Sequence, residues 1–329
     1  MTAAPTRRGF LAGAAAGAAL PLLGGAPAPA ATTVTETAGP LQARRPTVRR
    51  GRAIAASRDG KRLVVAHDRR RTIAIHATKG SSAPRIVDVG GQPMEVAISP
   101  NGRLAAVTTA FSDEPGLAIV DLRSAAVHTR ADVGPDPFGV AFTAAGTTLV
   151  VSGGEQEGAL HVLDARTFAV TARHAVGIVP RAVVTVPGSA TAWVALNGED
   201  HLFRVHLRTG RVTRKLRTPW LPDRLALSPD GERILVTHGG PDADRVSEIV
   251  IASGRVHQHQ AGALPSGVGW SARGRRVVAL AGTGEIVVLG RGRKRTRRAV
   301  GGEPRGLAIA GERAWTVDNL TGTVKGARL

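Results

Sequence analysis

Pairs of short apolar segments joined by a tight turn recur along almost the whole chain. Each pair is typical of two consecutive strands, because buried strands are apolar runs bounded by turn residues. The seven pairs occupy residues 53–66, 96–108, 140–152, 183–196, 225–237, 268–280 and 307–317. Their turn glycines are spaced 37 to 44 residues apart, at Gly60, Gly102, Gly146, Gly188, Gly231, Gly274 and Gly311. Repeats of this length predict an all-β fold, a seven-bladed β-propeller of four-stranded antiparallel blades.

Turn residues support this register. A proline stands in the connection before every inner strand except the first, at Pro93, Pro137, Pro180, Pro222, Pro265 and Pro304. Proline fixes φ and has no N–H, so we expect it in a turn just outside the strand. The dipeptides Asp59-Gly60, Asn101-Gly102 and Asp230-Gly231 favour hairpin turns whose twist matches that of the strands.

The seventh repeat is incomplete. After its first two strands only residues 322–329 remain, which is enough for a third strand but not for a fourth. An open outer edge would leave strand amides unpaired. We therefore expect Thr47 and Val48 to supply the missing strand, so that residues 47–329 form a propeller closed by an N-terminal strand.

The first thirty residues have the features of an export signal. The twin arginine Arg7-Arg8 precedes a short apolar run that ends in small residues at positions 26–30. This resembles a bacterial Tat signal peptide. Residues 11–23 are too short for a transmembrane helix, which needs about 20 apolar residues. We expect a Tat-type signal peptide over residues 1–30, a linker over 31–46, and export to the periplasm, cell wall or exterior, with no membrane span after signal removal.

The repeat also carries a family resemblance. The pattern Val-Gly-x-x-Pro-x-x-apolar-Ala-apolar-Ser-Pro-(Asn/Asp)-Gly is clearest at residues 89–102, and residues 107–109, 236–238 and 316–319 approximate a second-strand motif. In these residues the chain resembles the YVTN-type seven-bladed propellers, relatives of the lactonase-like propellers. The chain has no tyrosine. The resemblance implies the same fold over residues 47–329 and little about function, because fold does not determine chemistry.

The chain is strongly basic. Its 44 Lys and Arg against 25 Asp and Glu give a net charge of +19, or +17 once Arg7 and Arg8 are removed. We expect acidic loops between second and third strands and basic turns on the opposite face, which would attract a polyanion. Six cations predict a polyanion-binding turn on that basic face: Arg291, Arg293, Lys294, Arg295, Arg297 and Arg298.

Motifs of common catalytic sites are missing from the sequence. It has no Gly-x-Ser-x-Gly, His-Glu-x-x-His, phosphate-binding or dinucleotide pattern. It has no cysteine, which excludes disulfides, cysteine-ligated metals and covalent c-type haem. His257 and His259 alternate on one predicted strand, but no third ligand is evident from the sequence, so we expect no metal and no cofactor.

Four charged residues stand just after loop prolines, where a propeller places the rim of its central channel. They are Glu95, Arg181, Arg224 and Arg305. Three interpretations stay open: ion pairs between blades, an anion-binding site, or catalysis with Glu95 as a general base opposite arginines. Trp220, in a loop of the same face, either anchors a ligand or packs between two blades.

Two functions from different classes fit these observations. The first is an exported, monomeric, non-enzymatic propeller that binds an envelope or extracellular protein, or an anionic polymer, through its flat faces. The alternative is a lactonase-like hydrolase with its site at the channel mouth and Glu95 as the candidate catalytic residue. Metal dependence and a titrating Glu95 would indicate the enzyme, whereas affinity that falls with salt would indicate polyanion binding.

Export is expected to depend on the twin arginine. Changing Arg7→Lys and Arg8→Lys together in a tagged chain should leave precursor inside the cell, because the Tat pathway reads this pair. Fractionation followed by immunoblotting measures the outcome, and unchanged secretion would remove the Tat interpretation.

Overall fold

The computed structural model describes residues 51–67, 70–80, 82–110, 116–240, 243–290 and 294–329, all within one compact unit, Ala38–Leu329. These residues form 27 strands and no helix. The predicted signal peptide, linker and closing strand at Thr47 and Val48 lie outside the described residues.

The strands group into seven sheets, each ordered as in the sequence from the innermost strand outward. Blades 1 to 3 are β1 (Gly51–Ala56), β2 (Arg62–His67), β3 (Thr72–Ala77) and β4 (Arg85–Asp88); β5 (Gln92–Ile98), β6 (Leu104–Ala110), β7 (Leu117–Asp121) and β8 (Ala126–Ala131); and β9 (Pro137–Phe142), β10 (Thr148–Gly153), β11 (Gly158–Asp164) and β12 (Val170–Gly177). Blades 4 and 5 are β13 (Pro180–Thr185), β14 (Thr191–Leu196), β15 (His201–His206) and β16 (Val212–Arg217); and β17 (Pro222–Leu227), β18 (Arg233–His238), β19 (Arg245–Val250) and β20 (Val256–Gln260). Blades 6 and 7 are β21 (Pro265–Trp270), β22 (Arg276–Leu280), β23 (Glu285–Leu289) and β24 (Arg295–Ala299); and β25 (Pro304–Ala310), β26 (Arg313–Asp318) and β27 (Val324–Arg328).

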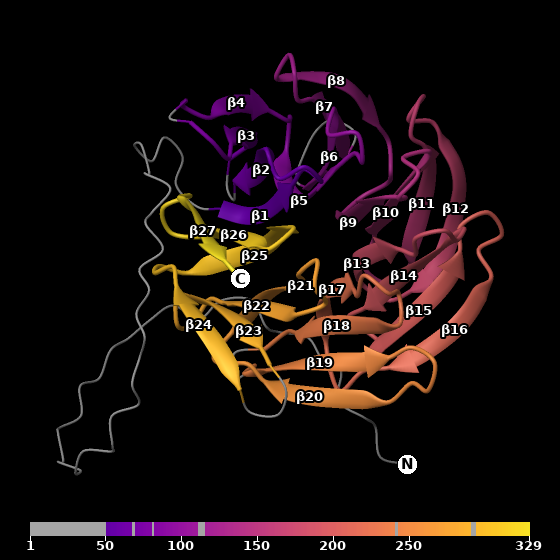
Figure 1. The fold of residues 1–329 in the computed structure, drawn as a ribbon. Helices are drawn as coiled ribbons and strands as arrows, with labels where there is room; N and C mark the ends of the chain where they lie inside the picture. Colours follow the sequence, from indigo (N-terminus) through magenta and orange to yellow (C-terminus); the bar gives the residue numbers. More distant parts are fainter. Residues whose placement is uncertain (1–50, 68–69, 81, 111–115, 241–242, 291–293) are drawn as a thin grey trace, which may run out of the picture. The chain divides into compact units, whose positions relative to one another are not determined.

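The blades form a closed ring (Figure 1). Every inner strand contacts the inner strands of the blades before and after it, and β25 of blade 7 contacts β1 of blade 1. All pairings within the blades are antiparallel. The predicted seven-bladed β-propeller is therefore confirmed. Among the described residues blade 7 has three strands, so its predicted fourth strand stays a prediction.

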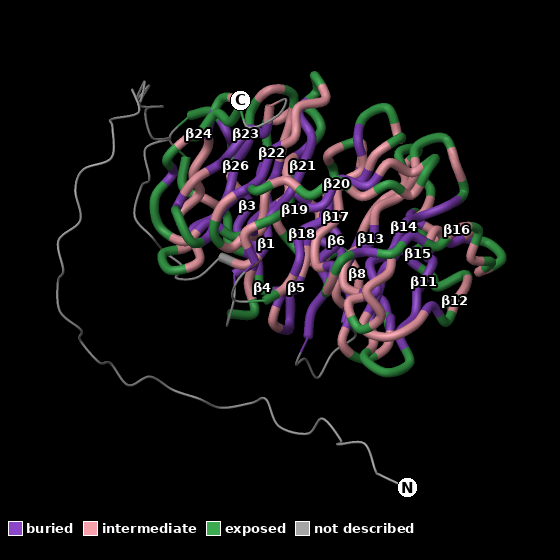
Figure 2. The backbone as a smooth tube through the Cα atoms, turned by 90° about the horizontal axis from the view of Figure 1, so that it is seen from below, coloured by how far each residue is buried: buried purple, intermediate pink, exposed green. Residues whose placement is uncertain are grey.

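Apolar packing between blades forms the core (Figure 2). The middle strands are buried on both faces, as in β14, whose six residues are all buried, whereas outermost strands such as β24 are largely exposed. One cluster joins Val64 and Ile73 of blade 1 to Val107 and Val120 of blade 2. Burial on both faces requires a neighbour on each side, which explains why the middle strands are continuous apolar runs.

Each first hairpin turn has its glycine in the left-handed region, but Asp59, Asn101 and Asp230 do not have positive φ. The Asp-Gly and Asn-Gly dipeptides therefore do not form the expected two-residue hairpin turns, because each glycine is the fourth residue of its turn, as in Gly60 N donating to Ser57 O at 2.8 Å. The seven turn glycines have φ between +62° and +72°, a conformation that strains other residues. Asn101 fixes one such turn by accepting hydrogen bonds from Ser99 Oγ at 2.7 Å and Arg103 N at 3.0 Å. Asp59 does the same for the first blade, accepting from Ser57 Oγ at 2.6 Å and Lys61 N at 3.0 Å.

Outermost strands are joined to the next blade by polar side chains. The donors reach turn carbonyls of the following blade: Arg85 to Arg123 O, His174 Nε2 to Leu207 O and Arg214 to Ala252 O, each at 2.7 Å. Arginine suits this role because its five donors extend from a long stem. Part of the cationic excess therefore stabilises contacts between blades.

A buried carboxylate joins blades 5 and 6. Glu248 of β19 is bonded to His259 Nε2 at 2.8 Å and to Arg276 Nε at 2.7 Å, and Arg233 lies 3.4 Å away. Its side chain is 4% exposed. Burial alone would raise the pKa of Glu248, but the hydrogen bonds from His259 and Arg276 lower it to about 2. His259 is thus bonded to a structural carboxylate, whereas His257 is exposed.

Glu248 should stabilise the ring above its unfolded pKa. Its pKa falls from 4.5 to about 2 on folding, so its contribution is full above 4.5 and is lost as the pH falls toward 2. Changing Glu248→Gln should cost about 3 kcal/mol at neutral pH, as for breaking a buried ion pair. Urea unfolding measured from neutral pH downward should show this difference narrowing below pH 4.5. A constant difference would contradict the assignment.

Closure by an N-terminal strand predicts that a chain beginning at Gly51 is less stable than one beginning at Thr32. Removing residues 32–50 would leave the outer edge of β27 unpaired. For domains of 150–250 residues each kcal/mol lost lowers the thermal midpoint by roughly 2–4 °C. Calorimetry of the two chains measures the effect, and equal midpoints would rule out this closure.

Candidate functional site at the channel mouth

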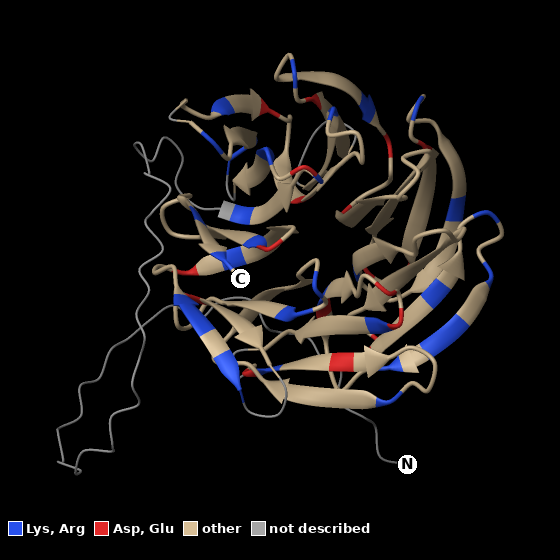
Figure 3. Cartoon of the chain, in the orientation of Figure 1, with Lys and Arg blue, Asp and Glu red and all other residues tan. Residues whose placement is uncertain are grey.

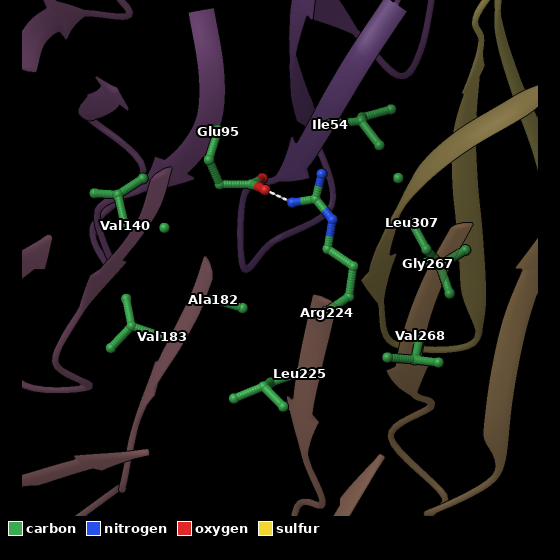
Figure 4. A pocket seen from close by; sticks show the side chains of 12 residues that line it. Ile54, Glu95, Val140, Ala182, Val183, Arg224, Leu225, Gly267, Val268 and Leu307 are labelled. Atoms are coloured by element: carbon green, nitrogen blue, oxygen red, sulfur yellow. Dashed lines mark ion pairs between the residues drawn. The ribbon is translucent and has the colours of Figure 1, made fainter. Parts of the chain in front are cut away.

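The seven inner strands form the innermost ring of the molecule around a central channel (Figure 1), and Figure 4 shows side chains that line this channel. A cavity of about 160 Å³ in the channel is lined by residues from every inner strand: Ile54, Glu95, Gly139, Val140, Ala182, Val183, Arg224, Leu225, Gly267, Val268, Gly306 and Leu307. A smaller cavity adjoins the same charged residues and is lined by Arg52, Met94, Glu95, Phe138, Arg181, Asp223 and Arg224. We call the residues of this second cavity the channel mouth.

On the face that bears the channel mouth, the loops that precede inner strands contact the loops between second and third strands. Val179 N donates to Glu155 O at 2.7 Å, and Leu264 N donates to Ala243 O at 2.8 Å. Each bond joins a loop before an inner strand to a loop between second and third strands. These two sets of loops therefore lie on one face of the ring. Val179 has a φ of 50°, which is strained for a β-branched residue.

All seven inner strands contain a register irregularity at their beginning. Six of them begin with the loop proline or carry it as the second residue, so the prolines lie inside the strands and not, as expected, just before them. Proline is tolerated there because the first residue of a strand need not donate to the ladder. The irregularity re-aims the side chains that follow.

The register irregularity leaves some backbone N–H groups of the inner strands without a partner in the adjacent strand, and side-chain hydroxyls accept hydrogen bonds from them. Glu95 N donates to Thr108 Oγ1 at 3.1 Å, and Arg224 N donates to Thr237 Oγ1 at 3.0 Å. Thr108 Oγ1 in turn donates to Phe138 O of the next blade at 2.7 Å. The backbone positions of Glu95 and Arg224 are therefore fixed by partly buried hydrogen bonds, and the Thr108 hydroxyl extends this contact into the neighbouring blade.

Seven residues occupy equivalent positions at the irregularity, which in six blades is two residues after the loop proline. They are Ala53, Glu95, Gly139, Ala182, Arg224, Gly267 and Gly306. Five are Gly or Ala, which leaves space for the two long side chains. Larger residues would not fit at some of these positions: a Cβ on Gly139 would lie 2.7 Å from Arg181 O, and one on Gly267 would lie 2.8 Å from the backbone of Leu307.

Glu95 and Arg224 form an ion pair across the channel. Figure 4 shows the two side chains pointing toward each other from β5 and β17. These strands belong to blades 2 and 5, which are separated by blades 3 and 4. The pair is partly shielded, with side chains 20% and 29% exposed. The pair is therefore an ion pair between two blades, as in the first of the three interpretations left open by the sequence, although the two blades are not adjacent.

A layer of positive charge surrounds this pair. Arg52 and Arg181 line the channel mouth, and Asp223 lies 3.8 Å from Arg224 Nε. The Arg181 guanidinium lies 4.5 Å from the centre of the Phe138 ring. Arg181 Nε is buried, and no described residue accepts a hydrogen bond from it. Three guanidinium groups thus converge with two carboxylates.

Burial and like charge both act on Arg224. The pKa of Arg224 is lowered to about 10, mainly by burial and further by the positive charges of Arg52 and Arg305. Arg224 remains protonated at neutral pH, but the positive charges of Arg52 and Arg305 repel its own. An anion bound beside it would relieve this repulsion.

Aliphatic side chains form the next layer of the channel. Ile54, Val140, Val183, Leu225, Val268 and Leu307 line the cavity from six of the seven inner strands. A charged ligand group would be poorly solvated among them. The polar chemistry of the channel is therefore concentrated at the mouth.

The structure brings together three of the predicted ligand-binding residues, Glu95, Arg181 and Arg224. Arg305 lies close enough to lower the Arg224 pKa, but its side chain is 46% exposed and pairs with Glu303 at 3.4 Å. Trp220 lines neither cavity. Its ring lies 4.8 Å from that of His238. A binding role for Arg305 or Trp220 stays a prediction.

Sequence reasoning missed Arg52 and the buried hydroxyls. Arg52 precedes Ala53 as Arg181 precedes Ala182, but the first blade lacks the loop proline that marked the other rim positions. The buried hydroxyls could have been found from a Thr or Ser that interrupts the apolar second strand of a blade, at Thr108, Ser152, Thr237 and Thr316.

The predicted polyanion-binding run lies partly outside the described residues. Arg291 and Arg293 are not described, and Lys294 is exposed. Arg295, Arg297 and Arg298 lie on β24, the outermost strand of blade 6, and not on a turn. They extend the sheet because each pairs with a residue of β23. Arg297 forms an ion pair with Glu285, which neutralises part of the run.

Within the described residues, no three His, Cys, Asp or Glu side chains gather as a metal site would require. The same part of the chain contains no helix that could cross a membrane.

The sequence matches no protein-family model and no curated protein. Its structure is similar to that of hydrazine synthase from Kuenenia stuttgartiensis, with a TM-score of 0.75 and 20% identity over 86% of this chain and 96% of that chain. It is also similar to a streptogramin B lyase, with a TM-score of 0.69 and 13% identity over 86% of this chain and 95% of that chain. At these identities the similarity is one of fold alone.

Proposed function

We propose that this chain is an exported, non-enzymatic binding propeller whose channel mouth receives an anionic group of its ligand. The ligand is an acidic side chain or terminal carboxylate of an envelope or extracellular protein, or an anionic group of a polymer, presented to this flat face. The observation that carries the proposal is the convergence of Arg52, Arg181 and Arg224 on one small cavity.

Charge at the mouth favours an anion. Three arginines face Glu95 and Asp223, and Arg305 adds a further positive charge nearby. Arg181 offers a buried N–H that no described residue accepts. Glu95 is the internal partner of Arg224, so an incoming carboxylate or phosphate competes with Glu95 for that guanidinium.

Cavity size argues against a lactonase-like hydrolase. Pockets for small-molecule ligands usually measure about 300–1,000 Å³, whereas the channel cavity measures about 160 Å³. The channel mouth, at about 20 Å³, is smaller still, so it receives one small ligand group, which displaces Glu95 from Arg224. A general base must also reach the proton that it removes, but Glu95 is engaged by Arg224 and by Val96 N at 3.3 Å.

Substitutions at the mouth test the proposal. Changing Arg181→Gln should weaken binding of acetate, phosphate or an acidic peptide about tenfold, the loss of about 1.4 kcal/mol expected for one charge-assisted hydrogen bond. Changing Glu95→Gln should tighten binding, because it removes the competing carboxylate. Titration calorimetry measures both effects.

The matched control is Arg58→Gln, which removes the same charge from an exposed turn of another blade. Equal losses in the Arg181 and Arg58 variants would contradict a localised site. Lactone hydrolysis by the wild type that disappears in Glu95→Gln would favour the hydrolase instead.

A further inference from the structure

The outer hairpin of blade 4 is unlike the other outer hairpins. Residues 201–217, which include β15 and β16, contain six cations and no Asp or Glu. The cations are Arg204, Arg208, Arg211, Arg214, Lys215 and Arg217. Each of the outer hairpins of blades 1, 2, 3, 5 and 6 contains at least one carboxylate, such as Asp164 in blade 3 and Glu285 in blade 6. In Figure 3 the cations follow β16 and the turn before it along the outer wall of the ring.

No described acid neutralises these charges. Arg204 donates to Thr191 Oγ1 at 3.0 Å, and Arg214 donates to Ala252 O at 2.7 Å. Both acceptors are uncharged, so neither of these two hydrogen bonds pairs an arginine with an anion. Arg208, Arg211 and Arg217 are exposed, and none forms an ion pair with a described residue. By contrast, Arg297 in the outer hairpin of blade 6 is paired with Glu285.

The charges extend over a distance that no single small anion covers. From Arg211 to Arg217 the chain advances six residues, which at about 3.3 Å per residue is roughly 20 Å. Arg208, in the turn before β16, lengthens the row. A linear ligand with several charges fits this spacing, because each cation can then meet a separate anionic group.

Aromatic stacking cannot contribute here. Phe203 is the one aromatic ring of the hairpin besides its histidines, and it is 7% exposed beneath Lys215, whose Nζ lies 4.6 Å from the ring centre. Proteins that bind the bases of single strands use exposed rings as platforms. Recognition at this surface therefore depends on charge along a backbone and not on bases.

We propose that the β15–β16 hairpin binds a linear chain of phosphate groups through Arg208, Arg211, Lys215 and Arg217, without reading bases. The surface lies on the outer wall of blade 4, apart from the channel mouth, so it does not depend on the proposed function of the mouth. Each phosphate contact releases counterions, so affinity should fall steeply with salt.

The test uses two probes of this chemistry, labelled oligo-deoxythymidine and inorganic polyphosphate, titrated by fluorescence anisotropy and by competition at several salt concentrations. Changing Arg208, Arg211 and Arg217 together to Ser should reduce the slope of log affinity against log salt by about 0.7 per lost contact, or roughly 2 in all. The three side chains are exposed, so the thermal midpoint should stay near that of the wild type.

A matched control removes three exposed cations elsewhere, by changing Arg58, Arg123 and Arg166 to Ser. This variant should keep most of the salt slope, because it has the same net charge but an intact hairpin. Equal slopes in the two triple variants would overturn the proposal in favour of diffuse attraction. Failure of the wild type to bind either probe would also overturn it, as would a clear preference between oligo-deoxythymidine and oligo-deoxycytidine.

Discussion

Closure of the ring is the constraint on which the rest of this structure depends. A single blade is apolar on both faces of its middle strands and cannot bury them alone. Each blade is stable only with a neighbour on either side, and only a ring gives the first and last blades such neighbours. The contact between β1 and β25 provides this closure, and all later features are built on it.

The channel mouth is formed by a backbone irregularity that recurs in every blade, with long side chains in only two of them. Every inner strand begins with such an irregularity, and residues beside it line the channel in every blade. Seven long side chains would not fit there, and five of the positions are Gly or Ala. The two exceptions are Glu95 and Arg224, which carry opposite charges and meet across the channel. The five positions with Gly or Ala are constrained by packing. Function is therefore expected at Glu95 and Arg224, where the repeat departs from small residues.

Arginine serves three purposes in this protein. On the outer strands Arg85 and Arg214 donate to carbonyl groups of the next blade. Between blades 5 and 6, Arg276 satisfies the buried carboxylate of Glu248. At the channel mouth Arg181 keeps a buried N–H that no described residue accepts. Net charge alone does not separate these roles, since stabilising and ligand-facing arginines count equally toward +19.

The sequence by itself determined the number of blades, the first two strands of each, the turn glycines and the face that carries the channel mouth. These features follow from local periodicity and from the backbone needs of Gly and Pro, which act within a few residues. It also predicted that Glu95, Arg181, Arg224 and Arg305 lie together at the channel rim, because equivalent positions of a repeat meet at the axis of a ring. Only the tertiary structure decided that Glu95 pairs with Arg224 across the channel, that Arg52 joins them, and that Arg305 pairs with Glu303 instead. Such choices depend on which side chains are long enough to span the channel and on the charges around them, and no repeat spacing encodes either.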